Sequence, residues 1–339
     1  MSGVLHVGWC LHIMQRMRFK VGLLLCTLLS LPQAIASSDD AARGKELIQQ
    51  AVDKTNIFAL PSFRMNANVR LENFGKPLNG TYSLLWNGPE QWREEITFPG
   101  YSEVQIGGKG IIYVKRSTTY MPYQIHKLRS AFPIRGAGIV PRPDETIKKI
   151  HEQKIGDSRA DCVEIASEQK STREVCVDTS TGTITRQKLG FIETDFAPVG
   201  SKTFPRIMAL IEKGKHIVDV QITELSKDVM LSTGVFGPPQ GAISRQGCID
   251  PVPGRLKHKV EPQYPVEDKI AGNQGTVGIF AVIGKSGVPQ NLEITLGASP
   301  GLNRTSMDAV RQWRYDPPTC GGEPTEVETT IEVNYQIQP

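Results

Sequence analysis

Hydrophobic and polar residues alternate along the last strand-like stretch of the chain. A period of two predicts a β-strand with one buried face, and here that face holds Val327, Thr329, Ile331, Val333 and Tyr335. Residues 275–283 and 288–296 alternate in the same way, and the intervening Gly284-Lys285-Ser286-Gly287 has the composition of a tight turn. The three stretches therefore predict a hairpin and one further strand.

A helical pattern lies between this hairpin and the last strand. Steps of four, three, one and three place residues on one helix face, and they separate Leu302, Ser306, Ala309, Val310 and Trp313. The helix is expected to stop at Tyr315-Asp316-Pro317-Pro318, because proline lacks an N–H and restricts the residue before it. The order strand, strand, helix, strand predicts a small ββαβ domain, with the helix on one face of an antiparallel sheet.

Several short motifs accompany this ββαβ pattern. They are Pro262-Gln263-Tyr264-Pro265, Gly275-x-Val277, Gly287-Val288, Ala309-Val310-x-x-Trp313-x-Tyr315-x-Pro317 and the closing strand. In this order and at this spacing, residues 260–337 resemble the C-terminal domain of TonB-type energy transducers. The run from Arg311 to Pro317 is the most specific part of the resemblance.

The resemblance implies how this domain would bind a partner. An edge strand offers unpaired N–H and C=O groups, to which an extended peptide can add as a further strand. TonB-like proteins hold the short N-terminal box of an outer-membrane receptor in this way. The peptide-binding residues implied here are Glu261, Pro262, Gln263, Val327, Thr329, Ile331 and Val333.

Two observations leave this interpretation open. Glu261 stands where the best-known members of the family carry glutamine, which puts the peptide preference in doubt. The glutamates of the last strand also have a simpler explanation, since charged side chains protect an exposed edge from aggregation. That explanation applies to Glu326, Glu328 and Glu332.

The middle of the chain combines one helix with a succession of strands. Residues 40–54 carry a helical apolar stripe that begins after Ser37-Ser38-Asp39-Asp40. Short strands separated by turn signals predict an antiparallel β meander or half-barrel, so the fold class is α+β. The predicted strands are 63–71, 82–87, 91–98, 101–106, 110–115, 146–155, 162–166, 173–177, 182–189, 204–211 and 216–225.

This order of elements resembles the LolA/LolB-like lipoprotein carriers, in which a half-barrel cups a helix and an apolar ligand. The resemblance implies a lipid or a lipoprotein as ligand, held in a continuous apolar cavity lined by alternate strand positions. Residues 120–143 interrupt the strands and are rich in aromatic and aliphatic side chains. They are interpreted either as a lid over such a cavity or as a surface loop that packs its own apolar groups.

Four segments follow from these patterns. They are a signal peptide (1–36), the antiparallel β domain (37–235), a linker rich in proline and glycine (236–259) and the TonB-like domain (260–339). The linker is expected to lack regular structure. Fully extended, it reaches less than about 90 Å, which argues against energy transduction from an inner-membrane motor.

The N-terminus indicates export. Arg16, Arg18 and Lys20 precede an apolar run, and Ala34-Ile35-Ala36 supplies small residues at a signal-peptidase site, so a periplasmic protein is predicted. An uncleaved anchor is the alternative, with Met14 or Met17 as alternative starts. Removing 1–36 leaves 36 basic residues, since 39 minus 3 is 36, against 35 acidic ones. A net charge of about +1 is no argument for nucleic acid.

Four cysteines remain in the exported chain. In an oxidising compartment an even number suggests disulfides, and three connectivities exist for Cys162, Cys176, Cys248 and Cys320. We favour Cys162–Cys176, across one apparent hairpin, and Cys248–Cys320, from the start of the C-terminal domain to its helix–strand turn. No Cys-x-x-Cys is present and the histidines are scattered, so neither a metal nor a cofactor is expected.

The familiar catalytic motifs are missing. The sequence holds no Gly-x-Ser-x-Gly, no His-Glu-x-x-His and no P-loop, so the protein is expected not to be an enzyme. The first hypothesis is a periplasmic adaptor that binds a peptide of an outer-membrane or envelope protein in TonB-linked transport. The second is a carrier of an apolar ligand, in which the C-terminal domain serves for docking or forms a homodimer.

Overall fold

The computed structural model describes residues 38–72, 76–131, 139–141, 145–167, 172–187, 191–227, 229–247 and 251–337. The predicted signal peptide and Cys248 lie outside these described residues. Within the described part of the chain, no helix combines the length and the apolar character that a membrane span requires. All of the described residues fall within one compact unit.

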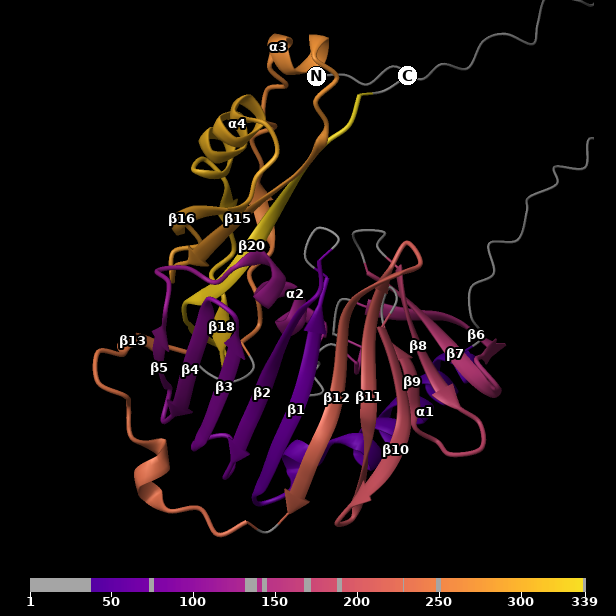
Figure 1. The fold of residues 1–339 in the computed structure, drawn as a ribbon. Helices are drawn as coiled ribbons and strands as arrows, with labels where there is room; N and C mark the ends of the chain where they lie inside the picture. Colours follow the sequence, from indigo (N-terminus) through magenta and orange to yellow (C-terminus); the bar gives the residue numbers. More distant parts are fainter. Residues whose placement is uncertain are drawn as a thin grey trace, which may run out of the picture. The chain divides into compact units, whose positions relative to one another are not determined.

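Antiparallel strands form most of the N-terminal domain (Figure 1), as the sequence predicts. Among the described residues they belong to one 13-stranded sheet, with the order β13-β5-β4-β3-β2-β1-β12-β11-β10-β9-β8-β7-β6. Twelve of them are β1 (Phe63–Leu71), β2 (Leu78–Trp86), β3 (Trp92–Phe98), β4 (Tyr101–Gly108), β5 (Ile111–Arg116), β6 (Glu145–Ile155), β7 (Ser158–Ser167), β8 (Thr172–Asp178), β9 (Ile184–Gln187), β10 (Phe191–Val199), β11 (Lys202–Glu212) and β12 (Lys215–Lys227).

One of these strands, β10, has no counterpart in the sequence prediction. Its alternation is broken in the middle, where Asp195 adopts a positive φ of 54° and both Glu193 and Asp195 are acidic. A residue in this conformation bends a strand and interrupts its period of two. Pairing with β11, from Phe191 opposite Leu210 to Val199 opposite Lys202, nevertheless keeps the segment in the sheet.

Two helices pack on the buried face of this sheet. Helix α1 (Ser38–Thr55) crosses the strands (Figure 1) and contributes Ile48, Ala51 and Val52 to a cluster with residues of β7 and β8. A larger cluster gathers the alternate residues of β1 to β4, such as Met65 and Trp92. The alternate strand positions therefore face a packed core.

The segment 120–143 contains a helix, α2 (Tyr123–Ala131). Its Ile125 and Leu128 are 3% and 1% exposed and belong to the core cluster of the sheet. This part of the predicted lid therefore packs as core, because the two apolar side chains are three residues apart on one helical face. Residues 132–138 and 142–144 lie outside the described residues.

The C-terminal domain has the predicted ββαβ order. Strands β15 (Gly275–Ile283), β16 (Pro289–Leu296) and β20 (Val327–Tyr335) form a sheet with the order β16-β15-β20, so β20 is an edge strand. Helix α4 (Pro300–Val310) packs on one face, and Ser299 caps it by accepting a hydrogen bond from the Leu302 N–H at 3.1 Å. A short helix, α3 (Val266–Ile270), precedes β15.

Helix α4 ends at Val310, earlier than the sequence predicts. Trp313 follows the helix, and Arg314–Tyr315 forms a short strand, β17, that pairs with β14 (Leu256–His258). The Tyr315 N–H also donates to the Gly287 carbonyl at 2.9 Å. These bonds to distant segments replace a last helical turn, so tertiary contacts end the helix before the prolines do.

The segment 236–259 is more ordered than a proline- and glycine-rich linker suggests. It begins at the end of a 3₁₀ helix, η2 (Thr233–Phe236), and then forms β13 (Ile243–Gln246) and β14. Strand β13 pairs with β5 and extends the large sheet, with Ile243 opposite Val114 and Gln246 opposite Ile111. Two further short strands, β18 (Thr319–Cys320) and β19 (Glu323–Pro324), pair with each other.

Candidate functional site

The strand predicted to bind a peptide is β20, and its two faces have different surroundings. Ile331 and Val333 are 6% and 5% exposed and join the apolar cluster beneath α4, together with Val277 and Ile279 of β15. Val327 and Thr329 are half-buried. The side chains of Ile331 and Val333 therefore pack within their own domain. What β20 leaves for a partner is the backbone of its unpaired edge.

The segment Glu261–Gln263 is held close to one end of β20. The Val260 carbonyl accepts a hydrogen bond from Trp313 Nε1 at 2.8 Å, and the Tyr264 ring packs edge-to-face on Tyr335 at 5.2 Å. Glu261 itself is exposed and pairs with Lys259 at 2.7 Å. Val327 lies eight residues from Tyr335, or about 27 Å along the strand. The predicted strand residues thus run along β20 from Val327 to Val333, and the segment Glu261–Gln263 lies beside its Tyr335 end.

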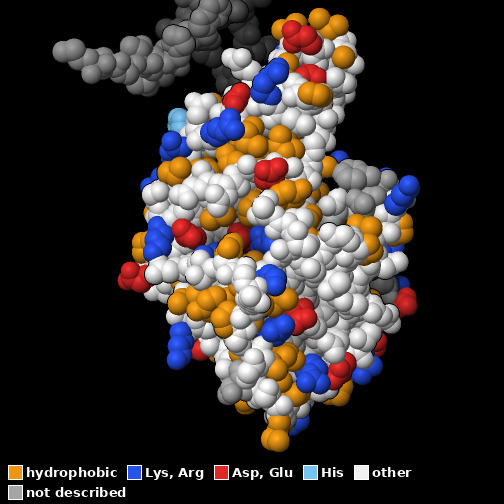
Figure 2. All heavy atoms as spheres, turned by 60° about the vertical axis from the view of Figure 1, so that its left-hand side comes forward, with side chains coloured by type: hydrophobic (Ala, Val, Ile, Leu, Met, Phe, Trp, Pro, Cys, Tyr) orange, Lys and Arg blue, Asp and Glu red, His pale blue; other side chains and the backbone are white. Residues whose placement is uncertain are grey.

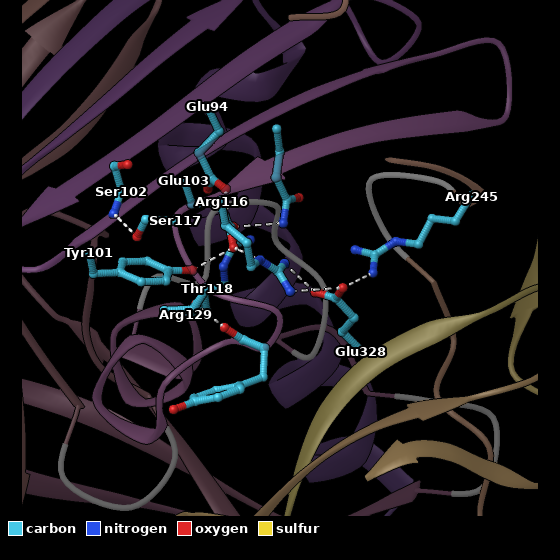
Figure 3. A network of polar contacts seen from close by, with 12 residues as sticks. Glu94, Tyr101, Ser102, Glu103, Arg116, Ser117, Thr118, Arg129, Arg245 and Glu328 are labelled. Atoms are coloured by element: carbon cyan, nitrogen blue, oxygen red, sulfur yellow. Dashed lines mark hydrogen bonds and ion pairs between the residues drawn. The ribbon is translucent and has the colours of Figure 1, made fainter. Parts of the chain in front are cut away.

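The second face of β20 is turned toward the N-terminal domain. Glu328 lies between two cations (Figure 3): it accepts hydrogen bonds from Arg116 Nη1 and Nη2 at 3.2 and 2.8 Å, and it also pairs with Arg245 of β13. The exposed fraction of the side chain is 6% for Arg116, 8% for Glu328 and 13% for Arg245. Charges this deeply buried are stabilised only by complete pairing.

Arg116 links Glu328 to a second buried carboxylate, Glu103. Arg116 Nε donates to Glu103 at 2.6 Å, and Arg129 of α2 donates to both Glu103 and Glu94 at 2.5 Å. Tyr101 Oη also donates to Glu103 at 2.6 Å. Burial alone would raise the pKa of Glu103, but the two arginines outweigh it and lower the pKa to about 2.

A second ionic contact joins the two domains beside this network. Glu332 pairs with Lys127 of α2 at 3.0 Å and accepts a hydrogen bond from Tyr123 Oη at 2.9 Å. Burial raises the pKa of the Tyr123 hydroxyl to about 12, and the neighbouring Glu332 adds to the shift. Burial opposes the ionised form of Glu332 as well, but the bond from Lys127 lowers its pKa overall.

Apolar packing accompanies the ion pairs. Phe280 and Val282, on the face of β15 opposite α4, belong to the core cluster of the N-terminal domain. Gly278 leaves room for the Tyr123 ring, since a Cβ at this position would lie 2.8 Å from it. The C-terminal sheet is therefore buried on both faces over part of its length, whereas its alternating pattern predicts one buried face.

Phe280, Val282, Glu328 and Glu332 form the docking face of the C-terminal sheet, which the sequence did not predict. Glu328 and Glu332 were considered as protectors of an exposed edge, yet in the structure both pair with cations of the N-terminal domain. Their signal is weak, because a glutamate on the polar side of a strand is the same in sequence whether it meets water or an arginine. Two apolar residues on the same side of β15, Phe280 and Val282, were the available hint.

The first predicted disulfide is confirmed. Cys162 and Cys176 are directly opposite each other on β7 and β8 and are bonded. Cys320 is disulfide-bonded as well, and Cys248, its predicted partner, lies outside the described residues.

A groove of about 570 Å³ lies over β1, β2, β11 and β12. Its lining mixes polar and charged residues with the apolar Val69, Ile207 and Val220; the polar and charged ones are Asn68, Arg70, Asn79, Asp219 and Gln221. Because Val69 and Val220 of the same strands point into the core, the groove is on the opposite face of the sheet. It therefore differs from the apolar cavity that the carrier hypothesis predicts.

Charge is dispersed over the visible surface. On the face drawn in Figure 2, lysine and arginine side chains are interspersed with aspartate and glutamate. A protein that binds nucleic acid non-specifically instead presents a continuous basic surface. The dispersed charge fits the small net charge calculated for residues 37–339.

Comparison with known proteins supports the domain assignment at the C-terminus. Residues 260–337 match the family model described as Gram-negative bacterial TonB protein C-terminal, as their motifs predict. The match covers 78 of 339 residues, from 260 to 337, and so describes one domain of the chain. No curated protein sequence matches the chain.

Solved structures with similar folds include a DUF1329 family protein from Desulfovibrio piger, 13% identical, which covers 58% of this chain and 97% of its own at a TM-score of 0.42. A LolA superfamily protein from Nitrosomonas europaea is 16% identical and covers 57% and 97%, with a TM-score of 0.36. The Pseudomonas aeruginosa MucA/MucB complex is 14% identical and covers 66% and 72%, with a TM-score of 0.28. At TM-scores below 0.5, none of these similarities assigns a function to the chain.

Proposed function

We propose that the protein is a non-enzymatic adaptor of the bacterial envelope, which binds an extended peptide of an outer-membrane or envelope protein along the free edge of β20. The observation that carries the proposal is the position of β20 as an edge strand in the domain that matches the TonB C-terminal family. An edge strand binds through main-chain hydrogen bonds, which any extended peptide can supply.

The side chains of β20 support recognition through the backbone. On one face of the strand, Ile331 and Val333 pack in the core beneath α4. The other face contains Glu328 and Glu332, which pair with cations of the N-terminal domain. Peptide specificity then falls to residues beside the edge, which are Glu261, Pro262 and Gln263. The adjacent Tyr264 packs on Tyr335 at the end of β20, which supports this assignment. The fixed domain contact presents β20 on a rigid support, which reduces the entropy lost on binding.

A pair of proline substitutions tests the edge. Consecutive residues of a strand point their N–H groups to opposite sides, so only one of Thr330→Pro and Ile331→Pro removes a donor from the bond ladder with β15. The other removes a donor from the free edge, which a strand tolerates. We expect the variant that stays folded, by far-ultraviolet circular dichroism, to lose affinity for a synthetic peptide carrying the N-terminal box of an outer-membrane receptor by tenfold or more.

Calorimetric titration of the folded variant and of the unchanged protein gives the answer. Equal affinities would refute strand addition on β20. Failure of the unchanged protein to bind any of a set of such boxes would refute the adaptor function itself. Glu261→Gln, which restores the residue of the best-known family members, serves as the matched side-chain variant and should change the peptide preference while leaving the fold intact.

The carrier hypothesis stays a prediction for the N-terminal domain. Apolar residues fill the buried face of its sheet, and α1 and α2 cover that face. A lipid would have to enter by displacing one of these helices. Mass spectrometry of an organic extract of the protein, purified from the envelope, tests this directly, since a carrier would release a stoichiometric lipid.

A further inference from the structure

Three polar or sulfur-bearing residues form a row across the end of the large sheet. His151 of β6 is directly opposite Cys162 of β7, and Cys162 is directly opposite Cys176 of β8. Residues paired in this way in antiparallel strands point their side chains to the same face. Glu174 lies two residues from Cys176 and therefore shares that face.

The ligand atoms of this row lie close together. One atom each of His151, Cys162 and Glu174 lie within 4.8 Å of one another, and His151 Nε2 is 3.2 Å from Glu174 Oε1. Glu174 Oε2 is 3.5 Å from Cys176 Sγ, which adds the second sulfur to the group. A tetrahedral zinc ion, with bonds of about 2.0–2.3 Å, requires ligand separations of roughly 3.5 Å. Small side-chain movements therefore suffice to form such a site.

One polar atom of the row is unsatisfied. His151 Nδ1 is buried and has no hydrogen-bond partner among the described residues. Gln153 Oε1 and Glu174 Oε2 lie 3.6 and 3.5 Å from the two sulfur atoms. A buried polar atom without a partner is uncommon and calls for an explanation. A cation bound at His151 Nδ1 would supply one.

We propose that the row is a redox-gated metal site, which binds one thiophilic cation such as Zn²⁺ after reduction of the Cys162–Cys176 disulfide. The ligands are Cys162 Sγ, Cys176 Sγ, one imidazole nitrogen of His151 and a carboxylate oxygen of Glu174. Two thiolates, an imidazole and a carboxylate are a donor set that suits zinc. The disulfide-bonded form offers no thiolate and binds the cation weakly.

The gating step is a thiol–disulfide exchange with a dithiol reductant. A thiolate of the reductant attacks one sulfur of the disulfide and forms a mixed disulfide with the protein. The second thiol of the reductant then attacks this mixed disulfide and displaces the protein thiolate. The S–S bond receives two electrons and two protons, while the reductant is oxidised to its own disulfide. Binding of the cation then displaces both thiol protons, which pass to the solvent.

The place of the row in the sheet explains how reagents reach it. Cys162 and Cys176 are both 0% exposed, but β6 is the terminal strand of the large sheet in the described residues. His151 on this strand has a side chain that is 37% exposed. Terminal strands open locally at a lower free-energy cost than central ones. Opening β6 moves His151 aside and uncovers the sulfurs.

Cobalt titration of the mature full-length protein tests the site. The protein is reduced with dithiothreitol, desalted without oxygen and titrated with Co²⁺, whose bonds to thiolates give intense near-ultraviolet charge-transfer absorption. We expect one equivalent bound by the reduced protein, at least 100-fold weaker binding by the oxidised protein, and displacement of Co²⁺ by Zn²⁺. Circular dichroism before the titration establishes that the reduced protein is folded.

Variants separate this site from the other cysteines. Cys248→Ser with Cys320→Ser removes the remaining thiols and should leave the bound equivalent unchanged, whereas Cys162→Ser with Cys176→Ser should abolish it. His151→Gln, which keeps the disulfide and the core, should weaken binding by tenfold or more. Unfolding on reduction, absence of charge-transfer absorption, equal binding by the oxidised protein, or full binding after loss of Cys162 and Cys176 would each overturn the proposal.

Discussion

The two faces of the C-terminal sheet are built from different chemistry. The face toward α4 is apolar, with Val277 and Ile279 of β15 against Ile331 and Val333 of β20. The face toward the N-terminal domain mixes Phe280 and Val282 with the charged Glu328 and Glu332. The first face folds the domain and the second docks it. Apolar burial depends little on partner or pH, whereas buried ion pairs are stable only while every member is present and ionised.

The largest effect should come from the apolar face. Ile331→Ala removes buried methyl groups beneath α4 and should lower the free energy of unfolding by about 3–4 kcal/mol. Chemical denaturation followed by the fluorescence of Trp313, which lies in the same cluster, measures this loss. Ile207→Ala is the control, since Ile207 is 44% exposed and its truncation should cost little. Equal losses for the two variants would contradict the packing described for β20.

A smaller loss is expected on the docking face, three residues along the same strand. Glu328→Gln leaves Arg245 without its carboxylate and should cost about 2–3 kcal/mol. Hydrogen exchange should rise at the contact of β20 with β5 and β13, while the ladder between β20 and β15 keeps its protection. Glu326→Gln is the matched control, because the described residues offer Glu326 no ion pair. Unfolding of the whole C-terminal domain by Glu328→Gln would show that the two faces are not separable.

Acid should lower the stability of the folded protein through a buried histidine of α2. Burial lowers the pKa of His126 on α2 to about 4, with Lys127 and Arg129 adding to the shift and Glu332 opposing it. Below about pH 6.5 His126 is therefore protonated in the unfolded chain but stays neutral in the folded protein. Stability should fall by about 2 kcal/mol between pH 7 and pH 5, as measured by urea denaturation.

The glutamates do not contribute in that range. The pKa of Glu103 is about 2 in the folded protein, so its stabilising effect is complete above about pH 4.5 and is lost only as the pH falls further toward 2. His126→Gln should consequently flatten the dependence between pH 7 and pH 5. An unchanged slope in that variant would exclude His126 as its cause.

The smallest effect should be a gain in stability. Thr330 is 9% exposed on the docking face, and its Oγ1 has no hydrogen-bond partner in the part of the chain that the structure describes. Thr330→Val keeps the shape and removes the unpaired hydroxyl, so stability should rise by about 1 kcal/mol. Thermal unfolding of the two proteins measures the change. A loss of similar size would show that this hydroxyl has a partner such as water.

The elements of both domains were largely predictable, and their contacts were not. Strand 63–71 agrees with β1 residue for residue, because its alternation is unbroken from Phe63 to Leu71. Strand β10 escaped prediction, because Asp195 interrupts its period. The segment around β13 was interpreted as a linker from its prolines and glycines, and only its bonds to β5 make it part of the sheet.

The candidate sites were likewise predictable where they depend on local pattern, and not where they depend on contacts between distant segments. Motif spacing identified the TonB-like domain, and the hairpin pattern led to the Cys162–Cys176 bond. The reasoning against a metal relied on the absence of Cys-x-x-Cys, which is a spacing along the chain. His151, Cys162 and Cys176 are separated by 11 and 14 residues and become neighbours only through strand register.

The sequence by itself determined the period of most strands, the ββαβ order of residues 260–337 and an even number of cysteines beyond residue 36. The tertiary structure decided that Glu328 meets Arg116 and Arg245, that β20 is an edge, and that a histidine faces a disulfide. The reason is physical. Periodicity reflects whether a side chain leaves water, which is a local property, whereas the identity of its partner depends on register between segments up to 212 residues apart.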